Sequence, residues 1–288
     1  MMTDHDRARL LVQCPDRRGI IAAVTGCLHA NGVNVIHSDQ HATAPEGGRF
    51  FMRLDFVLPE LAERLRHVRQ VFELNVAGPF EMTWAIHPVS ELKRAALLVS
   101  KADHALLELL WRWRRGELPM DVRMIVSNHP DLEGAAAGFG VPFHVVPTPR
   151  EGKADAEARL LDLFGDQVDL VVLARYMQVL SPELVARYRH RIINIHHSFL
   201  PAFVGANPYA RAHERGVKLI GATAHYVTED LDEGPIIEQD VIRVSHRHTV
   251  ADLRRLGADI ERQVLARAVR WHLEDRVLVH GNKTIVFD

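Results

Sequence analysis

The residue types best suited to chemistry gather in one short segment, RIINIHHSFLP at residues 191–201. An apolar strand is expected to end here, and the carboxyl ends of strands in α/β sheets are where ligands usually bind. Asn194 and His196 are two apart, so on a strand they share a face, whereas His197 turns to the other face. An amide that stabilises an oxyanion beside an imidazole that transfers a proton suits acyl chemistry. In isolation, two adjacent histidines more often have a structural role in a turn.

A second polar cluster lies in HYVTEDLDEGPII at residues 225–237. Its four acidic residues are Glu229, Asp230, Asp232 and Glu233. Such a loop is more often a solvated turn, and Gly234-Pro235 favours a turn. Asp232 follows the apolar Leu231 and is the candidate for a partly buried carboxylate. A carboxylate close to His196 would hold the imidazolium and position a water.

Other catalytic chemistries lack their sequence patterns. No GxGxxG follows the first strand of the larger half, and no GxxxxGK[ST] occurs, so dinucleotide and P-loop functions are not supported. The 18 histidines include no HExxH or Cys/His pair spacing, so we expect no metal site. No GxSxG occurs, which disfavours a serine nucleophile.

Composition restricts the class of protein further. The chain has 288 residues, which suits one small and one medium domain. A net charge of -2 shows no electrostatic footprint for nucleic acid. The N-terminus MMTDHDRARL has no apolar signal region, and no apolar run approaches the roughly 20 residues of a membrane helix. Two cysteines without a pairing framework predict a reducing, cytoplasmic location. The lack of a long apolar run predicts no membrane partner.

The first part of the chain predicts a small sheet with two helices. An apolar strand at 7–14 is followed by a helical pattern that ends at Asn31-Gly32. Two further strands, an amphipathic helix at 59–75 and a last strand, GPFEMTWAI, complete the order βαββαβ. This order predicts a ferredoxin-like module.

The pattern changes after HPVSELKR at 87–94. Short apolar strands then alternate with helical stretches, which predicts a doubly wound, mostly parallel, Rossmann-like sheet. Two longer strands, a long amphipathic helix and a final strand pair follow. We expect a first domain at 1–86, a linker at 87–94 and a second domain at 95–288.

Taken together, the segments NIHHSFLPAFVGANPY and GATAHYVTEDLDEGPII resemble the formyltetrahydrofolate-dependent formyltransferase superfamily. The resemblance is strongest to its deformylase branch, covers most of residues 90–288, and includes VSKADHALLELLWRW and LARYMQVLSP. It implies that Asn194, His196 and Asp232 are the catalytic trio. It also implies a folate pocket lined by Tyr176, Met177, Gln178, Val179, Leu180, Thr228, Glu229 and Asp230.

The first domain resembles an ACT domain, through CPDRRGIIAAVTGCLHANGVNV. The resemblance implies a regulatory domain that responds to an amino acid, with glycine and methionine as candidates. It places effector contacts at Gly19, Asn31, Gly32 and Asn34. Because ACT domains often share interfaces, and because sheet edges need cover, we expect a homo-oligomer.

The resemblance implies an enzyme that hydrolyses 10-formyltetrahydrofolate to formate and tetrahydrofolate, supplying formate and balancing one-carbon folate pools for purine synthesis. It requires no cofactor and no metal, and either His196 or Asp232 can be the formal base. The alternatives are a formyltransferase with an amine acceptor such as glycinamide ribonucleotide, and an inactive sensor. The segment at 99–104 contains no glycine to approach an acceptor phosphate, and we expect Asp103 to cap the following helix.

Overall fold

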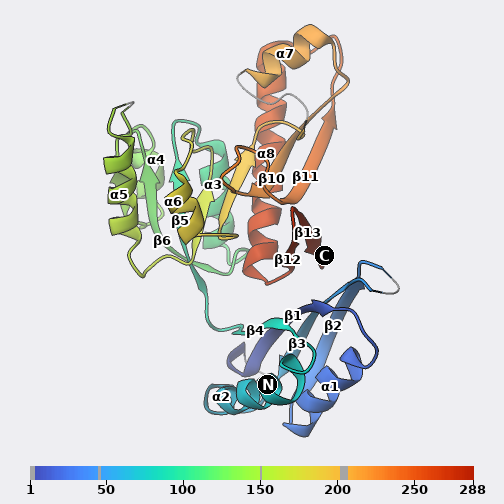
Figure 1. Cartoon of the computed structure of the whole chain (residues 1–288). Coiled ribbons are helices and arrows are strands. Elements are labelled where there is room, and N and C mark those ends of the chain that lie inside the picture. The colour runs from blue at the N-terminus through green and yellow to red at the C-terminus, as the bar shows by residue number, and fades with distance from the viewer. Residues whose placement is uncertain (1–3, 45–46, 150, 202–206) are drawn as a thin grey trace. The chain divides into compact units, whose positions relative to one another are not determined.

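The structure is a computed structural model that describes residues 4–44, 47–149, 151–201 and 207–288. It contains two compact units. The first runs to Leu92 and also contains Asp275–Leu278 and Ile285–Asp288. The second consists of Lys93–Glu274 and Val279–Thr284. Each unit is described separately below, with the elements labelled in Figure 1.

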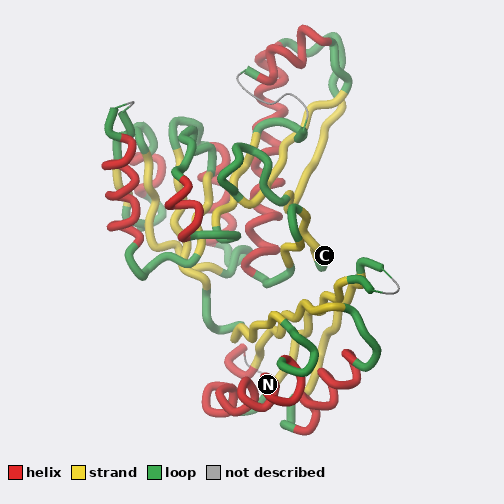
Figure 2. The backbone as a smooth tube through the Cα atoms, in the orientation of Figure 1, coloured by secondary structure: helices red, strands yellow, loops and turns green. Residues whose placement is uncertain are grey.

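The first unit is a four-stranded antiparallel sheet in the order β2-β3-β1-β4. Its elements are a short 3-10 turn η1 (Asp4–Asp6), β1 (Arg7–Pro15), α1 (Ile20–Ala30), β2 (Asn34–Ala42), β3 (Arg49–Val57), α2 (Leu61–Phe72), a π-helical turn η2 (Glu73–Ala77) and β4 (Thr83–Pro88). The expected ferredoxin-like order βαββαβ is confirmed. Both helices cover the same face of this sheet (Figure 2).

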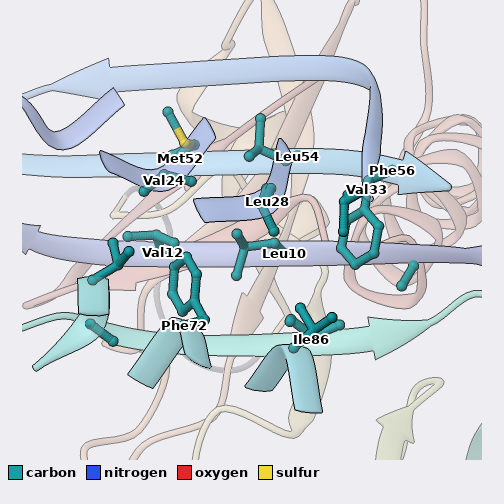
Figure 3. Close-up of a cluster of buried hydrophobic side chains, with 14 of the residues drawn as sticks. Leu10, Val12, Val24, Leu28, Val33, Met52, Leu54, Phe56, Phe72 and Ile86 are labelled. Carbon is teal, nitrogen blue, oxygen red and sulfur yellow. The ribbon is translucent and has the colours of Figure 1, made fainter. Parts of the chain in front are cut away.

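The core of the first unit lies between that face and the helices. Alternate residues of β1, including Leu10 and Val12, are fully buried. They meet Val24 and Leu28 of α1 and Phe72 of α2, as Figure 3 shows. The period of two in the strand and the spacing of four in the helix therefore point apolar side chains at one another.

Charged groups join the end of the chain to the first unit. Asp275 accepts from Arg9 Nη1 at 3.2 Å, and its backbone oxygen accepts from Arg53 Nε at 3.1 Å. Arg53 is only 3% exposed. Because a buried guanidinium needs partners, these contacts hold Asp275 against the sheet, an arrangement that the apolar pattern of the last two strands does not reveal.

The second unit contains a seven-stranded sheet in the order β11-β10-β9-β8-β5-β6-β7. Five strands run parallel, namely β9, β8, β5, β6 and β7 in sheet order, whereas β10 and β11 are antiparallel to their neighbours. The elements are β5 (Lys93–Val99), α3 (His104–Arg114), β6 (Met120–Ser127), α4 (Glu133–Ala137), β7 (Phe143–Val145), α5 (Lys153–Phe164), β8 (Leu170–Leu173), α6 (Pro182–Arg187), β9 (Ile192–His196), α7 (Pro208–Arg215), β10 (Leu219–Tyr226), β11 (Ile236–Arg243) and α8 (Val250–Leu273). A separate pair, β12 (Val277–His280) and β13 (Lys283–Val286), follows.

Helices cover both faces of the seven-stranded sheet (Figure 1). The buried side chains of α5 and α6 pack with one set of alternating strand residues, for example Ala96 and Leu98. Helix α8 packs against α3 and against β9, β10 and β11. This is the expected mostly parallel, doubly wound fold.

The strand order turns at β5, which has β6 on one side and β8 on the other. Such a switch point opens a crevice at the carboxyl ends of the strands, where ligands of α/β sheets bind. On the side of β8, the crevice is bounded by β9, β10 and α8. At Gly257, α8 approaches the side chain of Tyr209 so closely that a Cβ atom would overlap it.

Candidate active site

Two neighbouring antiparallel strands position the polar side chains at this crevice. Asn194 and His196 lie on β9, which ends at His196. In the pairing with β10, His225 is directly opposite Asn194, and Thr223 is opposite His196. Residues opposite one another in an antiparallel pair have closely spaced side chains. The register therefore brings a second imidazole to the amide of Asn194.

Asp232 reaches the same place from the turn between β10 and β11. Its Oδ2 lies 3.1 Å from Nδ1 of His196. Its backbone has a left-handed φ of 58°, which a short polar residue tolerates in a turn. The ends of this loop, residues 227–235, are held together because the amide of Tyr226 donates to the carbonyl of Pro235, and Gly234 passes so close to the Tyr226 carbonyl that a Cβ would overlap it. The structure thus brings together the three residues of the expected trio.

The hydrogen bonds define the state of His196. A carboxylate only accepts, so Nδ1 of His196 carries the hydrogen that is donated to Asp232. In the neutral imidazole the lone pair is then on Nε2. This atom is buried and has no hydrogen-bond partner among the described residues. His196 therefore presents a basic nitrogen in the crevice.

Asp232 is held in its ionised form. Burial alone would raise the pKa of its carboxyl, but the hydrogen bond from Nδ1 of His196 outweighs burial, so the pKa lies well below its usual range. A carboxylate with so low a pKa is a poor proton acceptor. Its geometry and charge suit it to orient His196 and to stabilise the imidazolium.

His225 orients the amide of Asn194. Its Nδ1 lies 3.0 Å from the backbone oxygen of Tyr226, which can only accept, so Nδ1 is protonated. Its Nε2 is then free to accept from Nδ2 of Asn194, at 3.2 Å. This bond fixes which end of the Asn194 amide carries the N–H groups. His225 was not predicted from the sequence, because its partner is 31 residues away and only the strand register reveals the pair.

These side chains line a cavity of about 680 Å³, a volume typical of small-molecule sites. Of the residues expected to contact folate, it is lined by Tyr176, Met177, Gln178, Val179, Leu180, Thr228 and Glu229. Asp230 is exposed and is not part of the lining. Met177, Val179 and Leu231 are apolar and at least half exposed, so the cavity offers apolar contact surface to a ligand.

The cavity wall contains a second polar cluster that the sequence analysis did not predict. Glu261 on α8 is only 2% exposed, and its carboxylate accepts from Nε2 of His104 at 2.8 Å and from the hydroxyl of Tyr209 at 2.7 Å. Nε of Arg175 lies 3.4 Å away. Burial alone would raise the pKa of Glu261, but the hydrogen bond from His104 and the charge of Arg175 hold it below its ordinary value. Glu261 and its three partners come from four separate segments, which is why no local pattern indicates the cluster.

His197 also differs from expectation. Its ring stacks on that of His196, with centroids 5.2 Å apart, and it lines the same cavity. The expectation that it turns away is wrong, because β9 ends at His196 and strand alternation stops there. Burial and then the charge of Arg175 lower the pKa of His197 to about 4, so this ring is neutral at neutral pH.

Asp103 likewise corrects an expectation. It occupies the N-cap position of α3, but its side chain makes no capping hydrogen bond. Its dihedral angles, φ −84° and ψ −27°, are helical, whereas a capping side chain needs an extended N-cap backbone. Ser100 in the same segment is engaged, since its hydroxyl accepts from the amide of Met177 at 3.0 Å.

The expected effector residues lie at both ends of α1. Gly19 precedes the helix with a φ of 91°, and Asn31 ends it. Gly32 has a φ of 74°, and Asn34 begins β2. The eleven residues of α1 separate these ends by about 16 Å at about 1.5 Å per residue. Within one chain they do not form a single contact site.

Two absences hold for the part of the chain that the structure describes. There, no group of three or more His, Cys, Asp or Glu residues has the arrangement of a metal site. Across the same residues, no helix combines the length and apolar character needed to span a membrane.

Comparison with known proteins identifies the class to which this fold and site belong. Residues 93–269 match the formyl transferase family, and residues 8–73 match the ACT domain. A glycinamide ribonucleotide transformylase from Symbiobacterium toebii is similar over 68% of this chain and 95% of its own, with 36% identity and a TM-score of 0.63.

Relatives of the full length narrow the class. A formyltetrahydrofolate deformylase from Bacillus subtilis is 52% identical over 99% of this chain and 95% of its own, and one from Mycobacterium bovis is 57% identical over 98% and 91%. The solved deformylase from Pseudomonas syringae pv. tomato is 48% identical, with a TM-score of 0.94 over 98% of this chain and 95% of that one. The chain belongs to the formyltetrahydrofolate deformylase family.

We predict that His225 acts on the reaction by orienting Asn194. His225→Leu removes the acceptor for the Asn194 amide and should lower kcat about tenfold or more, with KM within about twofold, because one orienting hydrogen bond of about 1.4 kcal/mol is lost. His225→Gln, which offers a side-chain oxygen as acceptor, should recover part of the loss. The measurement is steady-state kinetics with thermal unfolding of both variants. Equal kcat in wild type and His225→Leu would contradict the assigned role.

Proposed function

We propose that the chain hydrolyses 10-formyltetrahydrofolate to formate and tetrahydrofolate. The observation that carries this proposal is the convergence of Asn194, His196 and Asp232 in the cavity of about 680 Å³. The relatives that match over the full length, with 52% and 57% identity, are named formyltetrahydrofolate deformylases. The transformylase from Symbiobacterium toebii matches only 68% of the chain, so the full-length relatives favour hydrolysis over transfer to glycinamide ribonucleotide.

In the proposed mechanism, Asn194 and His196 act on the two sides of one carbonyl addition. The oxygen of water attacks the formyl carbon, and Nε2 of His196 takes the proton that water loses. The N–H of Asn194 that is not bound to His225 donates to the oxyanion. An oxyanion donor commonly contributes about 10²–10³ in rate.

Collapse of the tetrahedral intermediate breaks the bond from carbon to N10. The protonated Nε2 of His196 gives its proton to N10, which leaves as an amine, and formic acid loses a proton to become formate. Asp232 stabilises the imidazolium between the two transfers through its 3.1 Å contact with Nδ1. His196 rather than Asp232 is the base in this proposal, because the pKa of Asp232 is low and its Oδ2 is already bound to His196.

The residues that line the cavity support folate as the ligand. Met177, Val179 and Leu231 offer exposed apolar surface, which suits the flat faces of a pteridine. Tyr176, Gln178, Leu180, Thr228 and Glu229 complete the proposed folate contacts. Asp230 belongs to the proposal through the hydrogen bond that its backbone oxygen accepts from Thr228.

His196 carries the proton from water to N10, and formic acid releases its own proton to solvent, so the proposal includes no cofactor. We assign catalysis to residues 95–288, regulation to 1–86 and the connection to 87–94, in keeping with the family matches at 93–269 and 8–73. The proposed location is the cytoplasm, where the reaction would balance one-carbon folate pools for purine synthesis.

The ACT domain supports proposals about regulation and assembly. We propose glycine or methionine as effector and a homo-oligomer as the working state. Because Gly19 and the pair Asn31-Gly32 lie at opposite ends of α1, one effector would contact both only across two copies.

Ultracentrifugation tests the oligomer, and activity assays with the amino acids test the effector. We expect an oligomer at micromolar concentration and a change of rate with glycine or methionine, and a monomer with an unchanged rate would overturn it.

The central experiment supplies 10-formyltetrahydrofolate with and without glycinamide ribonucleotide. We expect formate at the same rate in both assays, and formylated nucleotide in place of formate would refute hydrolysis.

Alanine substitutions of the trio should each lower kcat by about 10²–10⁴, the range of oxyanion and acid–base contributions. The variants are Asn194→Ala, His196→Ala and Asp232→Ala. His196→Ala with a normal rate and unchanged thermal stability would contradict the mechanism.

A further inference from the structure

Arg175 places a positive charge in the wall of the cavity. It follows β8 with a left-handed φ of 65°, and its carbonyl accepts from the amide of Ser100 at 3.2 Å. Its side chain is 17% exposed and is held by Glu261, whose carboxylate is 3.4 Å from Nε. The backbone and the ion pair together fix where the guanidinium lies.

The guanidinium of Arg175 has donors to spare. Nη1 is buried and has no hydrogen-bond partner among the described residues, and Nε makes only the 3.4 Å ion-pair contact with Glu261. The carboxylate of Glu261 is engaged with His104 and Tyr209, so it does not satisfy Nη1. Buried donors are normally paired, and Arg175 lines the same cavity as His196 and Asp232. These donors therefore suit a ligand that enters the cavity.

The proposed hydrolysis generates such a ligand. A neutral formyl group and water become formate, an anion formed beside the ionised Asp232, which repels it. The charge of Arg175 acts on this region, since it lowers the pKa of His197, whose ring stacks on His196. A guanidinium is the preferred partner of a carboxylate.

We propose that Arg175 forms the subsite that binds the formate product and draws it away from Asp232. This inference rests on the proposed function and adds a product-binding residue to it. Glu261, with His104 and Tyr209, positions the guanidinium, while Nη1 donates to one formate oxygen. Arg175 thereby separates the anion from the catalytic carboxylate.

The test is product inhibition by formate, with tetrahydrofolate formation as readout, in wild type, Arg175→Gln and Arg175→Lys. We expect the inhibition constant for formate to rise about tenfold or more in Arg175→Gln, the effect of losing one charge-assisted hydrogen bond, with KM for the formylated folate within about twofold. Arg175→Lys should give an intermediate value. Arg255→Gln is the matched control, because Arg255 is an exposed arginine of α8 that does not line the cavity, and it should leave the constant unchanged.

A second measurement does not depend on turnover. Titration of ¹³C-labelled formate into the enzyme with tetrahydrofolate, followed by NMR line broadening, should show binding in wild type and loss in Arg175→Gln. The double variant Arg175→Gln/Glu261→Gln removes the buried charge of Glu261 together with its partner, so it should fold and still lose formate binding.

Several outcomes would overturn the inference. The first is an equal inhibition constant for formate in wild type and Arg175→Gln. The second is the absence of formate binding to wild type, and the third is stronger competition by inorganic phosphate than by formate. If the wild type releases formate while these results are found, only the Arg175 subsite fails. If the wild type releases no formate from the formylated folate, the proposed function fails instead.

Discussion

The hydrogen bond between His196 and Asp232 is the interaction on which the rest of the site depends. With Nδ1 donating to Asp232 at 3.1 Å, the lone pair of His196 is directed away from the carboxylate and is available on Nε2. The loop after β10 places that carboxylate, since it combines the left-handed Asp232 with a glycine that passes close to the Tyr226 carbonyl. A longer or looser turn would separate the two groups.

The change from parallel to antiparallel pairing at β10 supplies the other half of the site. A parallel neighbour needs a long crossover connection, whereas β10 leads directly through the Asp232 turn into β11. The antiparallel register sets His225 opposite Asn194. One strand pair thus orients the amide, and the turn that follows it orients the imidazole, so two catalytic functions share one local structure.

Prediction from sequence succeeded where the contacts were local. The spacing of Asn194 and His196 on an expected strand indicates a shared face, and the apolar periodicity indicates both sheets. Apart from Asp232 and His196, which the family resemblance joined, it failed where distant segments meet. His104 and Glu261 are 157 residues apart, and Asp275 is joined to Arg9 across 266 residues. Asp103 shows a different limit, since its residue type favours a cap but its backbone angles prevent one.

The tautomer of His196 tests the central claim most directly. Imidazole nitrogens with and without hydrogen differ strongly in ¹⁵N chemical shift, so ¹⁵N-histidine NMR, with His196→Gln to assign the signal, reports which nitrogen is protonated. In the neutral ring we expect a protonated Nδ1 and a bare Nε2 in wild type, and loss of this preference in Asp232→Leu. A neutral His196 protonated on Nε2 in the wild type would contradict the account, because its lone pair would then lie on Nδ1, toward Asp232, and could not accept the proton from water.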